Sequence, residues 1–314
     1  MRAATIQDGS LVVEERLDPQ PGPGEILVRV RAAGVNGADM LQVRGMYPAP
    51  PGSPPDIPGL ELAGEVAAVG PWVNRFGEGD RVMAVVGGGG QAELAVVHER
   101  AAMPVPRGLD WPQAGGIPEV FVTAHDAIFS QARLRPGEHL LVHGAAGGVG
   151  TAAVQLGRVG GARVTATVRR EELRQPVEGL GARALAPEGF GELGPYDVVL
   201  ELVGASNLAG NLNALATGGR ITVIGVAGTG AKGEINLGAL MGKRARIHGS
   251  TLRARPLEEK ALAMRLVEKE VLPLFEDGTI TVPVADTFPL DQIERAYERF
   301  SAGGKLGKIV VLMD

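Results

Sequence analysis

Cysteine is absent from this chain of 314 residues. Its absence excludes disulfide bonds, thiol nucleophiles, iron–sulfur clusters and a four-cysteine zinc site within the chain. Histidine does not take its place as a metal ligand. His139 and His143 lie four residues apart, but they fall on an apolar strand, where this spacing does not bring two ligands to one ion. We therefore expect no metal site.

A strong net charge and a long apolar run are also lacking. The chain has 31 basic and 36 acidic residues, a formal net charge of -5, and no basic run that would indicate a nucleic-acid partner. No apolar run reaches the roughly 18 residues that cross a bilayer. The first eight residues lack the apolar core of a signal peptide. We therefore expect no membrane partner and a cytoplasmic location.

The chain is long enough for two domains, and its pattern of apolar and turn-forming residues changes near residue 111. Before that point, short apolar strands broken by Gly and Pro predict a mostly antiparallel β domain. A proline-rich loop is expected over 44–59. The strands expected in this first part are 11–15, 25–32, 62–70, 80–86 and 92–97.

After residue 111 the pattern predicts one helix over 112–131 and then strands that alternate with helices. This alternation is typical of a parallel sheet covered on both faces. A helical stretch over 256–280, followed by strands at 282–288 and 308–313, is expected to return the chain to the β domain. The six strands expected in the parallel sheet are 140–143, 163–168, 184–186, 197–203, 220–225 and 246–251.

A glycine-rich turn follows the first of these six strands and leads directly into a helix. Glycine lets the backbone bend tightly and approach a pyrophosphate, whose charge then lies at the positive helix N-terminus. The spacing matches G-x-G-x-x-G, with alanine in place of the first glycine. Its position between a strand and a helix predicts a dinucleotide-binding turn. The residues of the turn are Ala145, Ala146, Gly147, Gly148, Val149 and Gly150.

Five motifs, in this order, resemble those of the medium-chain dehydrogenase/reductase superfamily, and within it the zinc-free quinone oxidoreductases. The resemblance implies an α/β fold: a doubly wound parallel Rossmann sheet over 119–254, and a mostly β, GroES-like catalytic domain made of 1–118 and 255–314. Asn36 and Leu60 stand where zinc-dependent relatives carry a cysteine and a histidine, and neither is a useful zinc ligand. The five motifs are 33–39, 58–64, 79–82, 145–150 and 307–311.

The end of the second strand predicts which nicotinamide cofactor is bound. In NAD-preferring versions of this fold an acidic residue holds the ribose at that place. Here the strand ends in Arg169 and Arg170, whose guanidinium groups suit a ribose 2′-phosphate, so we expect NADPH. A solvated pair of surface arginines is the alternative. The ends of later strands are expected to line the cofactor, through Gly204, Gly225, Val226 and Leu252.

The resemblance also implies three catalytic residues. Asn36 is expected to orient the nicotinamide or to donate to the substrate oxygen, Tyr47 to stack on the substrate or donate a hydrogen bond, and Thr123 to contact the nicotinamide. Each has a simpler explanation as well. The Asn36 side chain can form hydrogen bonds within its own loop, and Tyr47 can pack against Pro48. The Thr123 hydroxyl can form a hydrogen bond to the preceding helical turn.

These observations favour an NADPH-dependent quinone reductase that transfers hydride without a metal. The alternatives are an NADPH-dependent enone or enoyl-thioester reductase with Tyr47 as proton donor, and a non-catalytic NADPH-binding protein. The partner is expected to be a small quinone or enone. The sixth strand, 246–251, should form a sheet edge, and relatives pair that edge across a two-fold axis, so a homodimer is also expected.

Overall fold

The computed structural model describes residues 1–313, and the contacts among Cα atoms divide the chain into two units. Unit 1 comprises Met1–Val122, Leu252–Gly303 and the segment from Lys308 onward. Unit 2 comprises Thr123–Thr251 and the short segment Gly304–Gly307. The sequence analysis placed the divisions after 118 and after 254, and it did not separate 304–307 from the β domain.

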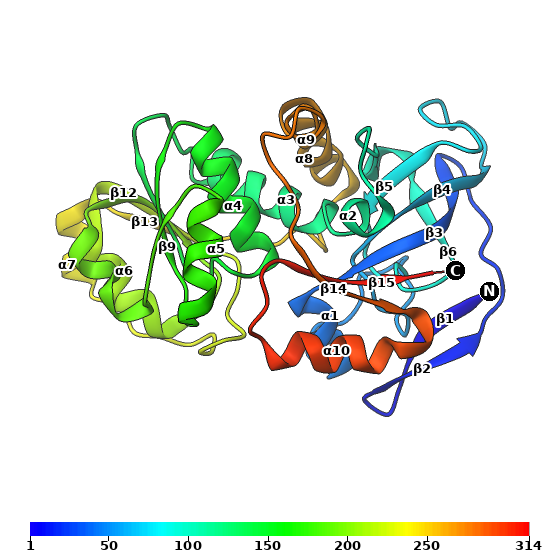
Figure 1. The fold of residues 1–314 in the computed structure, drawn as a ribbon, viewed down its shortest axis with the longest axis horizontal. Coiled ribbons are helices and arrows are strands. Elements are labelled where there is room, and N and C mark those ends of the chain that lie inside the picture. Colours follow the sequence, from blue (N-terminus) through cyan, green and yellow to red (C-terminus); the bar gives the residue numbers. More distant parts are fainter. Residues whose placement is uncertain (314) are drawn as a thin grey trace. The chain divides into compact units, whose positions relative to one another are not determined.

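Unit 1 is built on a seven-stranded sheet, with a separate two-stranded ribbon of β1 and β2. The strand order is β14-β15-β3-β4-β5-β7. Strand β6 is not part of this series and pairs with β3. In Figure 1 the last strand, β15, lies beside the early strand β3, and the two are antiparallel. The strands are β1 (Arg2–Gln7), β2 (Ser10–Glu15), β3 (Glu25–Val35), β4 (Glu61–Val69), β5 (Arg81–Val85), β6 (Leu94–His98), β7 (Ala102–Pro104), β14 (Val284–Pro289) and β15 (Lys308–Leu312).

The strands predicted for this unit are confirmed, and so is the irregular loop over 44–59. Apolar side chains on the inner face of the sheet form the core, together with helix α10. The helices and single helical turns of unit 1 are α1 (Gly37–Val43), η1 (Glu99–Ala101), α2 (Trp111–Gly115), α8 (Leu257–Glu270), α9 (Leu272–Glu276), η6 (Leu290–Gln292) and α10 (Ile293–Ala302).

The single helix predicted over 112–131 is wrong. The segment instead forms α2, then α3 (Pro118–His125), and then a π-helical turn, η2 (Asp126–Gln131). A break occurs at the glycines because Gly115 packs directly on β3: a Cβ there would lie 2.7 Å from the Cβ of Ala32. Pro118 then opens α3, where its missing N–H costs nothing and its fixed φ suits the first helical position.

Unit 2 is built on a six-stranded parallel sheet whose order is β10-β9-β8-β11-β12-β13. Counted from β8, this is the 3-2-1-4-5-6 order of a doubly wound sheet. Successive strands are added on one side of β8 up to β10 and on its other side from β11 onward. All six strands predicted from the sequence are confirmed. Their bounds are β8 (His139–Val142), β9 (Arg163–Thr167), β10 (Arg183–Leu185), β11 (Tyr196–Glu201), β12 (Leu215–Val223) and β13 (Arg246–Gly249).

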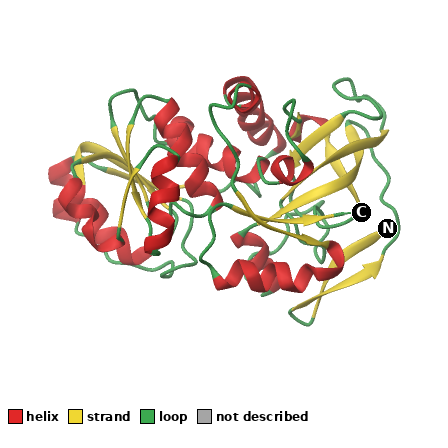
Figure 2. Cartoon of the chain, in the orientation of Figure 1, coloured by secondary structure: helices red, strands yellow, loops and turns green. Residues whose placement is uncertain are grey.

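Helices cover both faces of this sheet (Figure 2), as the near-continuous apolar strands require. Leu140, Leu141 and Leu200 are fully buried. None of the helices described within residues 1–313 combines the length and apolar character needed to cross a membrane. The helical elements that lie within unit 2 are η2 (Asp126–Gln131), α4 (Gly148–Val159), η3 (Glu171–Leu173), α5 (Arg174–Gly179), η4 (Pro187–Leu193), η5 (Ala205–Asn207), α6 (Leu208–Ala214) and α7 (Leu237–Lys243).

Candidate functional site

The glycine-rich turn connects β8 to α4 at the point where the strand order reverses. Gly144 has a φ of +64°, a conformation that costs a side-chain-bearing residue strain. A Cβ on Gly150 would lie 2.6 Å from both the Cα of Ala145 and the carbonyl oxygen of Gly144. Glycine at this position therefore allows the first turn of α4 to pack directly against the chain that leaves β8.

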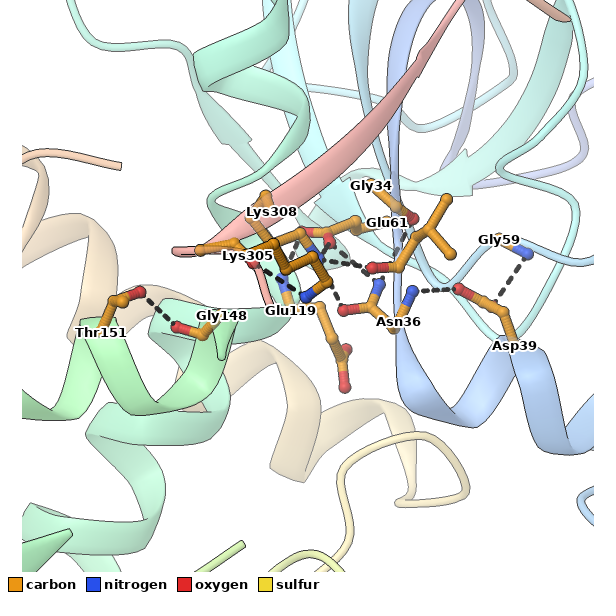
Figure 3. Close-up of polar contacts among 12 residues, drawn as sticks. Gly34, Asn36, Asp39, Gly59, Glu61, Glu119, Gly148, Thr151, Lys305 and Lys308 are labelled. Atoms are coloured by element: carbon orange, nitrogen blue, oxygen red, sulfur yellow. Dashed lines mark hydrogen bonds and ion pairs between the residues drawn. The ribbon is translucent and has the colours of Figure 1, made fainter. Parts of the chain in front are cut away.

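The first turn of α4 is the part of this region best suited to bind an anion. Its N-cap is Gly147, which has no side chain to satisfy the first helical N–H groups. The hydroxyl of Thr151 donates to the carbonyl of Gly148 at 2.9 Å, and so leaves those N–H groups unused (Figure 3). The backbone donors at Gly148–Gly150 and the positive helix end thus fit a pyrophosphate.

The two alanines of the turn have structural partners. The N–H of Ala145 donates to the carbonyl of Thr167 at 3.2 Å, and the carbonyl of Ala146 accepts from the N–H of Gly307 at 2.8 Å. Gly307 also forms a β-bridge with Gly147, which is why Gly304–Gly307 belongs to unit 2. The turn is therefore held from both sides by backbone hydrogen bonds.

The arginine pair follows β9, as the sequence placed it. Both side chains are exposed, and Arg169 has no polar partner within residues 1–313. Arg170 lies against Gly304, where a Cβ would come within 2.8 Å of its guanidinium carbon. Its Nη1 is 3.4 Å from the carboxylate of Glu172. The Nε of Arg174 donates to the carbonyl of Val168, the residue before Arg169, at 3.3 Å.

The other expected cofactor residues lie at strand ends. Gly204 follows β11 with a φ of +139°, and Gly225 follows β12, where a Cβ would lie 2.6 Å from the carbonyl of Leu202. Val226 is 37% exposed and offers an apolar surface of unit 2. Leu252 begins the second segment of unit 1 and is buried there.

A buried polar network lies beneath the ends of β8, β9 and β11. Asn211 on α6 donates from Nδ2 to Glu201 at 2.8 Å, so its Oδ1 accepts from Nε2 of His143 at 2.6 Å. The other ring nitrogen, Nδ1, therefore accepts the hydroxyl proton of Thr167 at 2.9 Å. Burial lowers the pKa of His143, so the imidazole is neutral although it lies 3.9 Å from Glu201.

The carboxylate of Glu201 also fixes the backbone of the following loop. Its Oε1 accepts from the N–H of Val203 at 2.7 Å and from the N–H of Gly204 at 2.9 Å. The network thus joins three strand ends, one helix and the loop that carries Gly204. The sequence analysis considered His143 only as a metal ligand, which it excluded, and did not foresee these partners.

A second buried network lies in unit 1 and contains Asn36 (Figure 3). Glu61, the first residue of β4, and Lys308, the first residue of β15, form an ion pair at 2.6 Å with both side chains buried. The ammonium of Lys308 also donates to Oδ1 of Asn36 at 2.7 Å and to the carbonyl of Val35 at 3.1 Å. The second oxygen of Glu61 accepts from the N–H of Glu119 at 2.9 Å.

These contacts fix the orientation of the Asn36 carboxamide. Lys308 can only donate, so the atom it contacts must be the amide oxygen. Nδ2 then donates to Glu61 at 2.9 Å and to the carbonyl of Gly34 at 3.3 Å. Because both amide hydrogens have acceptors, any further hydrogen bond of this side chain can only be accepted at Oδ1. Asn36 is thus arranged to accept a hydrogen bond rather than to donate one.

Asp39 holds the backbone around Asn36. It is fully buried, and its carboxylate accepts from the N–H of Asn36 at 2.8 Å and from the N–H of Gly59 at 3.1 Å. Burial raises the pKa of Asp39 to about 6, although these two hydrogen bonds act in the opposite direction. Asp39 thus caps the N-terminus of α1 by accepting from the N–H of the N-cap residue Asn36.

Tyr47 lies in the proline-rich loop and is held by Arg253. The guanidinium carbon of Arg253 is 5.0 Å from the centre of the Tyr47 ring, and its Nη1 donates to the carbonyl of Tyr47 at 2.8 Å. Arg253 also donates to the carbonyl of Gly87 and to the side chain of Gln42, at 2.8 and 2.5 Å. This buried arginine fixes the loop, and burial lowers its pKa.

Thr123 is buried within α3 and is the first residue of unit 2, whereas Asn36 and Tyr47 belong to unit 1. The sequence analysis missed Lys308 and Arg253 as partners of these residues. Lys308 lies in the motif at 307–311, which was used only to identify the resemblance. A lysine that opens a buried strand needs an acceptor and so offered a signal for the pair. Within residues 1–313 no group of three or more His, Cys, Asp or Glu side chains could hold a metal ion.

Comparison with known proteins assigns the family. Residues 22–107 match the alcohol dehydrogenase GroES-like domain, and residues 182–311 match the zinc-binding dehydrogenase family. The quinone oxidoreductase of Rattus norvegicus is 32% identical over 94% of this chain and 91% of its own length. That of Homo sapiens is 32% identical over 100% of this chain and 98% of its own length.

Solved structures agree with this assignment. An alcohol dehydrogenase superfamily protein from Novosphingobium aromaticivorans superposes with a TM-score of 0.88 at 28% identity, covering both chains completely. A thermostable alcohol dehydrogenase from Pyrobaculum aerophilum gives a TM-score of 0.85 at 30% identity over 99% of each chain. The sheet order, the glycine turn and these similarities show that the chain belongs to the quinone oxidoreductase branch of the medium-chain dehydrogenase/reductase superfamily, a family of nicotinamide-dependent oxidoreductases.

Proposed function

We propose that this protein is an NADPH-dependent quinone reductase that acts without a metal. Its similarity to proteins named quinone oxidoreductases over nearly the whole chain supports the reaction class. The observation that carries the choice of cofactor is the arginine pair at the end of β9, where an NAD-preferring protein would place an acidic residue. Two exposed guanidinium groups favour a phosphate over a bare ribose hydroxyl.

The residues of unit 2 fit this cofactor. The first turn of α4 would hold the pyrophosphate through backbone N–H groups, and Arg169 with Arg170 would hold the 2′-phosphate. The turn from Ala145 to Gly150 and the strand ends at Gly204 and Gly225 would allow close backbone approach. Val226 would supply apolar surface, and Leu252, which belongs to unit 1, is proposed as a further cofactor contact. When bound, NADPH supplies the hydride.

The proposed catalytic residues have different tasks. Asn36 would accept a hydrogen bond through Oδ1 and so orient the group that donates it. The aromatic ring of Tyr47, fixed by Arg253, would offer a flat surface for a planar substrate. Thr123 would contact the nicotinamide through its hydroxyl group. A quinone is itself a strong electrophile, so positioning is the main contribution required of these side chains.

The proposal of a metal-independent reaction rests on the donor set. Asn36 and the buried Leu60 are not the cysteine and histidine that would bind zinc. Glu61 is already neutralised by Lys308 at 2.6 Å. A divalent cation would have to displace that ammonium before it could use the carboxylate.

A double-bond reductase is the second candidate. Reduction of an enone or enoyl thioester needs a proton for the α-carbon, and the Tyr47 hydroxyl could supply it. Burial raises the pKa of Tyr47, so the hydroxyl keeps its proton at neutral pH. A non-catalytic NADPH-binding protein is the third candidate, and any turnover would eliminate it.

The test compares oxidation of NADPH and NADH by the purified protein with an ortho-quinone, a para-quinone and a simple enone. Quinone turnover that prefers NADPH, and a preference abolished in Arg169→Ala/Arg170→Ala, are expected. The double variant Arg183→Ala/Arg244→Ala removes the same charge from exposed sites of unit 2 and is the matched control. Equal use of both cofactors, unaffected by the first double variant, would refute the assignment of NADPH.

The acceptors separate the remaining candidates. Turnover of the enone alone, lost in Tyr47→Phe, would replace the quinone proposal by double-bond reduction. NADPH binding without turnover of any acceptor would favour the binding protein. Removal of metal with a chelator should leave the rate unchanged, and a loss that zinc restores would overturn metal independence.

We further propose a cytoplasmic homodimer formed through β13. This strand is the edge of the parallel sheet and pairs with β12 alone in the part of the chain that the structure describes. An unpaired edge offers a row of backbone donors and acceptors to a second copy. Sedimentation equilibrium should give twice the mass of one chain, and a monomer would refute the proposal.

A further inference from the structure

A second concave region of unit 2 lies where β8, β12 and β13 begin, at the opposite end of the strands from the glycine turn. It is a pocket of about 600 Å³. Its lining is strongly cationic, with four arginines and one histidine against one glutamate. The side chains that matter are Arg133, Arg135, Glu138, Arg220, Arg246 and His248.

One arginine of the pocket is already neutralised. Arg220 donates from Nη1 and Nη2 to the two oxygens of Glu138, each at 2.8 Å. The second of these oxygens also accepts from the backbone N–H of Arg135 at 2.9 Å. The single negative charge of Glu138 is thus shared, mainly with Arg220 and in part with Arg135, and the pocket keeps an excess of positive charge.

Three guanidinium groups remain without a hydrogen-bonded or ion-paired partner, although the Arg135 charge also interacts with Glu138. Arg133, Arg135 and Arg246 are exposed, and their side chains have no polar partner among residues 1–313. His248 adds no charge at neutral pH, because burial and the nearby Arg220 lower its pKa, and its Nε2 is bonded to the hydroxyl of Thr222 at 2.9 Å. Three like charges thus gather in one pocket of a chain whose net charge is -5.

The loop that carries two of these arginines is held rigidly. Arg220 donates to the carbonyls of Ala132 and Arg133, at 2.8 and 2.9 Å. Leu134, between Arg133 and Arg135, is buried and anchors the loop. Arg133 has a φ of +53°, a left-handed conformation that a non-glycine residue adopts at a cost. These contacts keep like charges close together against their mutual repulsion.

We propose that this pocket binds a polyvalent phosphate anion, such as the phosphate chain of a small phosphorylated molecule. Guanidinium groups match phosphate oxygens in shape and charge, and three of them balance a multiply charged anion. A volume of about 600 Å³ is typical of pockets for small organic ligands rather than for a single inorganic ion. The site is distinct from the proposed cofactor site, which uses the other end of the same sheet.

Calorimetric titration with inorganic triphosphate tests the proposal. The titration is run on the full chain with NADPH present at saturation, and on Arg169→Ala/Arg170→Ala, so that binding at the cofactor site does not contribute. Affinity should fall at least about tenfold in Arg133→Ala/Arg135→Ala and in Arg246→Ala, and should fall steeply with added salt. It should be unchanged in Arg183→Ala, an exposed arginine of the same unit outside the pocket.

Two results would overturn the proposal. One is the absence of triphosphate binding, or binding that disappears in Arg169→Ala/Arg170→Ala but persists in Arg133→Ala/Arg135→Ala. The other is a change of oligomeric mass in Arg246→Ala without any change in triphosphate affinity, which would assign the arginines to contacts between copies. Neither result bears on NADPH preference, so failure here is distinguishable from failure of the proposed function.

Discussion

Glu61 in unit 1 and Glu201 in unit 2 are both buried carboxylates at a strand end, but they are compensated differently. Glu61 is paired with the buried ammonium of Lys308 at 2.6 Å (Figure 3). Glu201 has no lysine or arginine partner within residues 1–313. It accepts instead from two backbone N–H groups and from the side-chain amides of Asn207 and Asn211.

The difference shows two ways of keeping a charge inside a protein. In an ion pair, one cation compensates most of the buried negative charge. Removal of that cation therefore leaves an unpaired buried charge. Several N–H donors share the compensation, so the loss of one leaves the others in place. Unit 1 should therefore be more sensitive to a single substitution than unit 2.

The largest expected effect is that of Lys308→Met. The substitution leaves the carboxylate of Glu61 buried without its cation and should lower the free energy of unfolding by about 3–5 kcal/mol. Denaturant titration measures this loss. The double variant Lys308→Met/Glu61→Gln should recover much of it, whereas Lys269→Met, at an exposed site, should have little effect. A loss no larger than that of the exposed control would contradict the assignment of a buried pair.

The next largest effect is a pH dependence of stability that arises from Asp39 in unit 1. Its pKa is raised from 3.8 to about 6 by burial, so the folded state favours the protonated form. The contribution to stability is full below pH 3.8 and is lost as the pH rises through about 6. The shift corresponds to a change on the order of 3 kcal/mol across that window. In Asp39→Asn this part of the pH dependence of stability should vanish. An unchanged slope of unfolding free energy against pH would refute the assignment to Asp39.

His143, in unit 2, should give a pH dependence of stability with the opposite slope. Its pKa is lowered from 6.5 by burial, so the unfolded state binds more protons. Its contribution is present above pH 6.5 and is lost as the pH falls through the lower value of the folded state. Subtracting the pH profile of His143→Gln from that of the wild type isolates this contribution.

A smaller effect is expected for Asn211→Leu. The substitution leaves Nε2 of His143 and one oxygen of Glu201 without this partner, at a cost of about 1–3 kcal/mol. Asn213→Ala, at an exposed position of the same helix, is the matched control and should be nearly neutral. If Asn211→Leu destabilised the protein more than Lys308→Met, the contrast between the two units would be reversed.

The smallest effect is that of Arg170→Ala on stability. Arg170 and Glu172 form an exposed pair at 3.4 Å, with side chains 47% and 64% accessible. Exposed pairs of this kind contribute about 0–1 kcal/mol. The thermal unfolding midpoint should therefore barely change while the preference for NADPH falls. A marked loss of stability would mean that the arginine has a structural role.

Local pattern was enough to predict the strands other than β1 and β7, the glycine turn and the position of the arginine pair. Each depends on residues adjacent in the sequence, such as the apolar run before Gly144. The helix over 112–131 was mispredicted, because close packing of Gly115 on Ala32 is a contact between distant segments. For the same reason the partners of Asn36 and Tyr47 were not foreseen.

The sequence by itself determined the fold class, the glycine-rich turn between β8 and α4 and the exclusion of cysteine chemistry, because apolar periodicity, glycine and composition act locally. Only the tertiary structure decided which groups compensate one another. Lys308 meets Glu61 across 247 residues, and Arg253 reaches Tyr47 across 206. Strand order and loop packing bring these groups together, and neither the periodicity nor the spacing of a single chain specifies them. The acceptor role of Asn36 follows from that assembly.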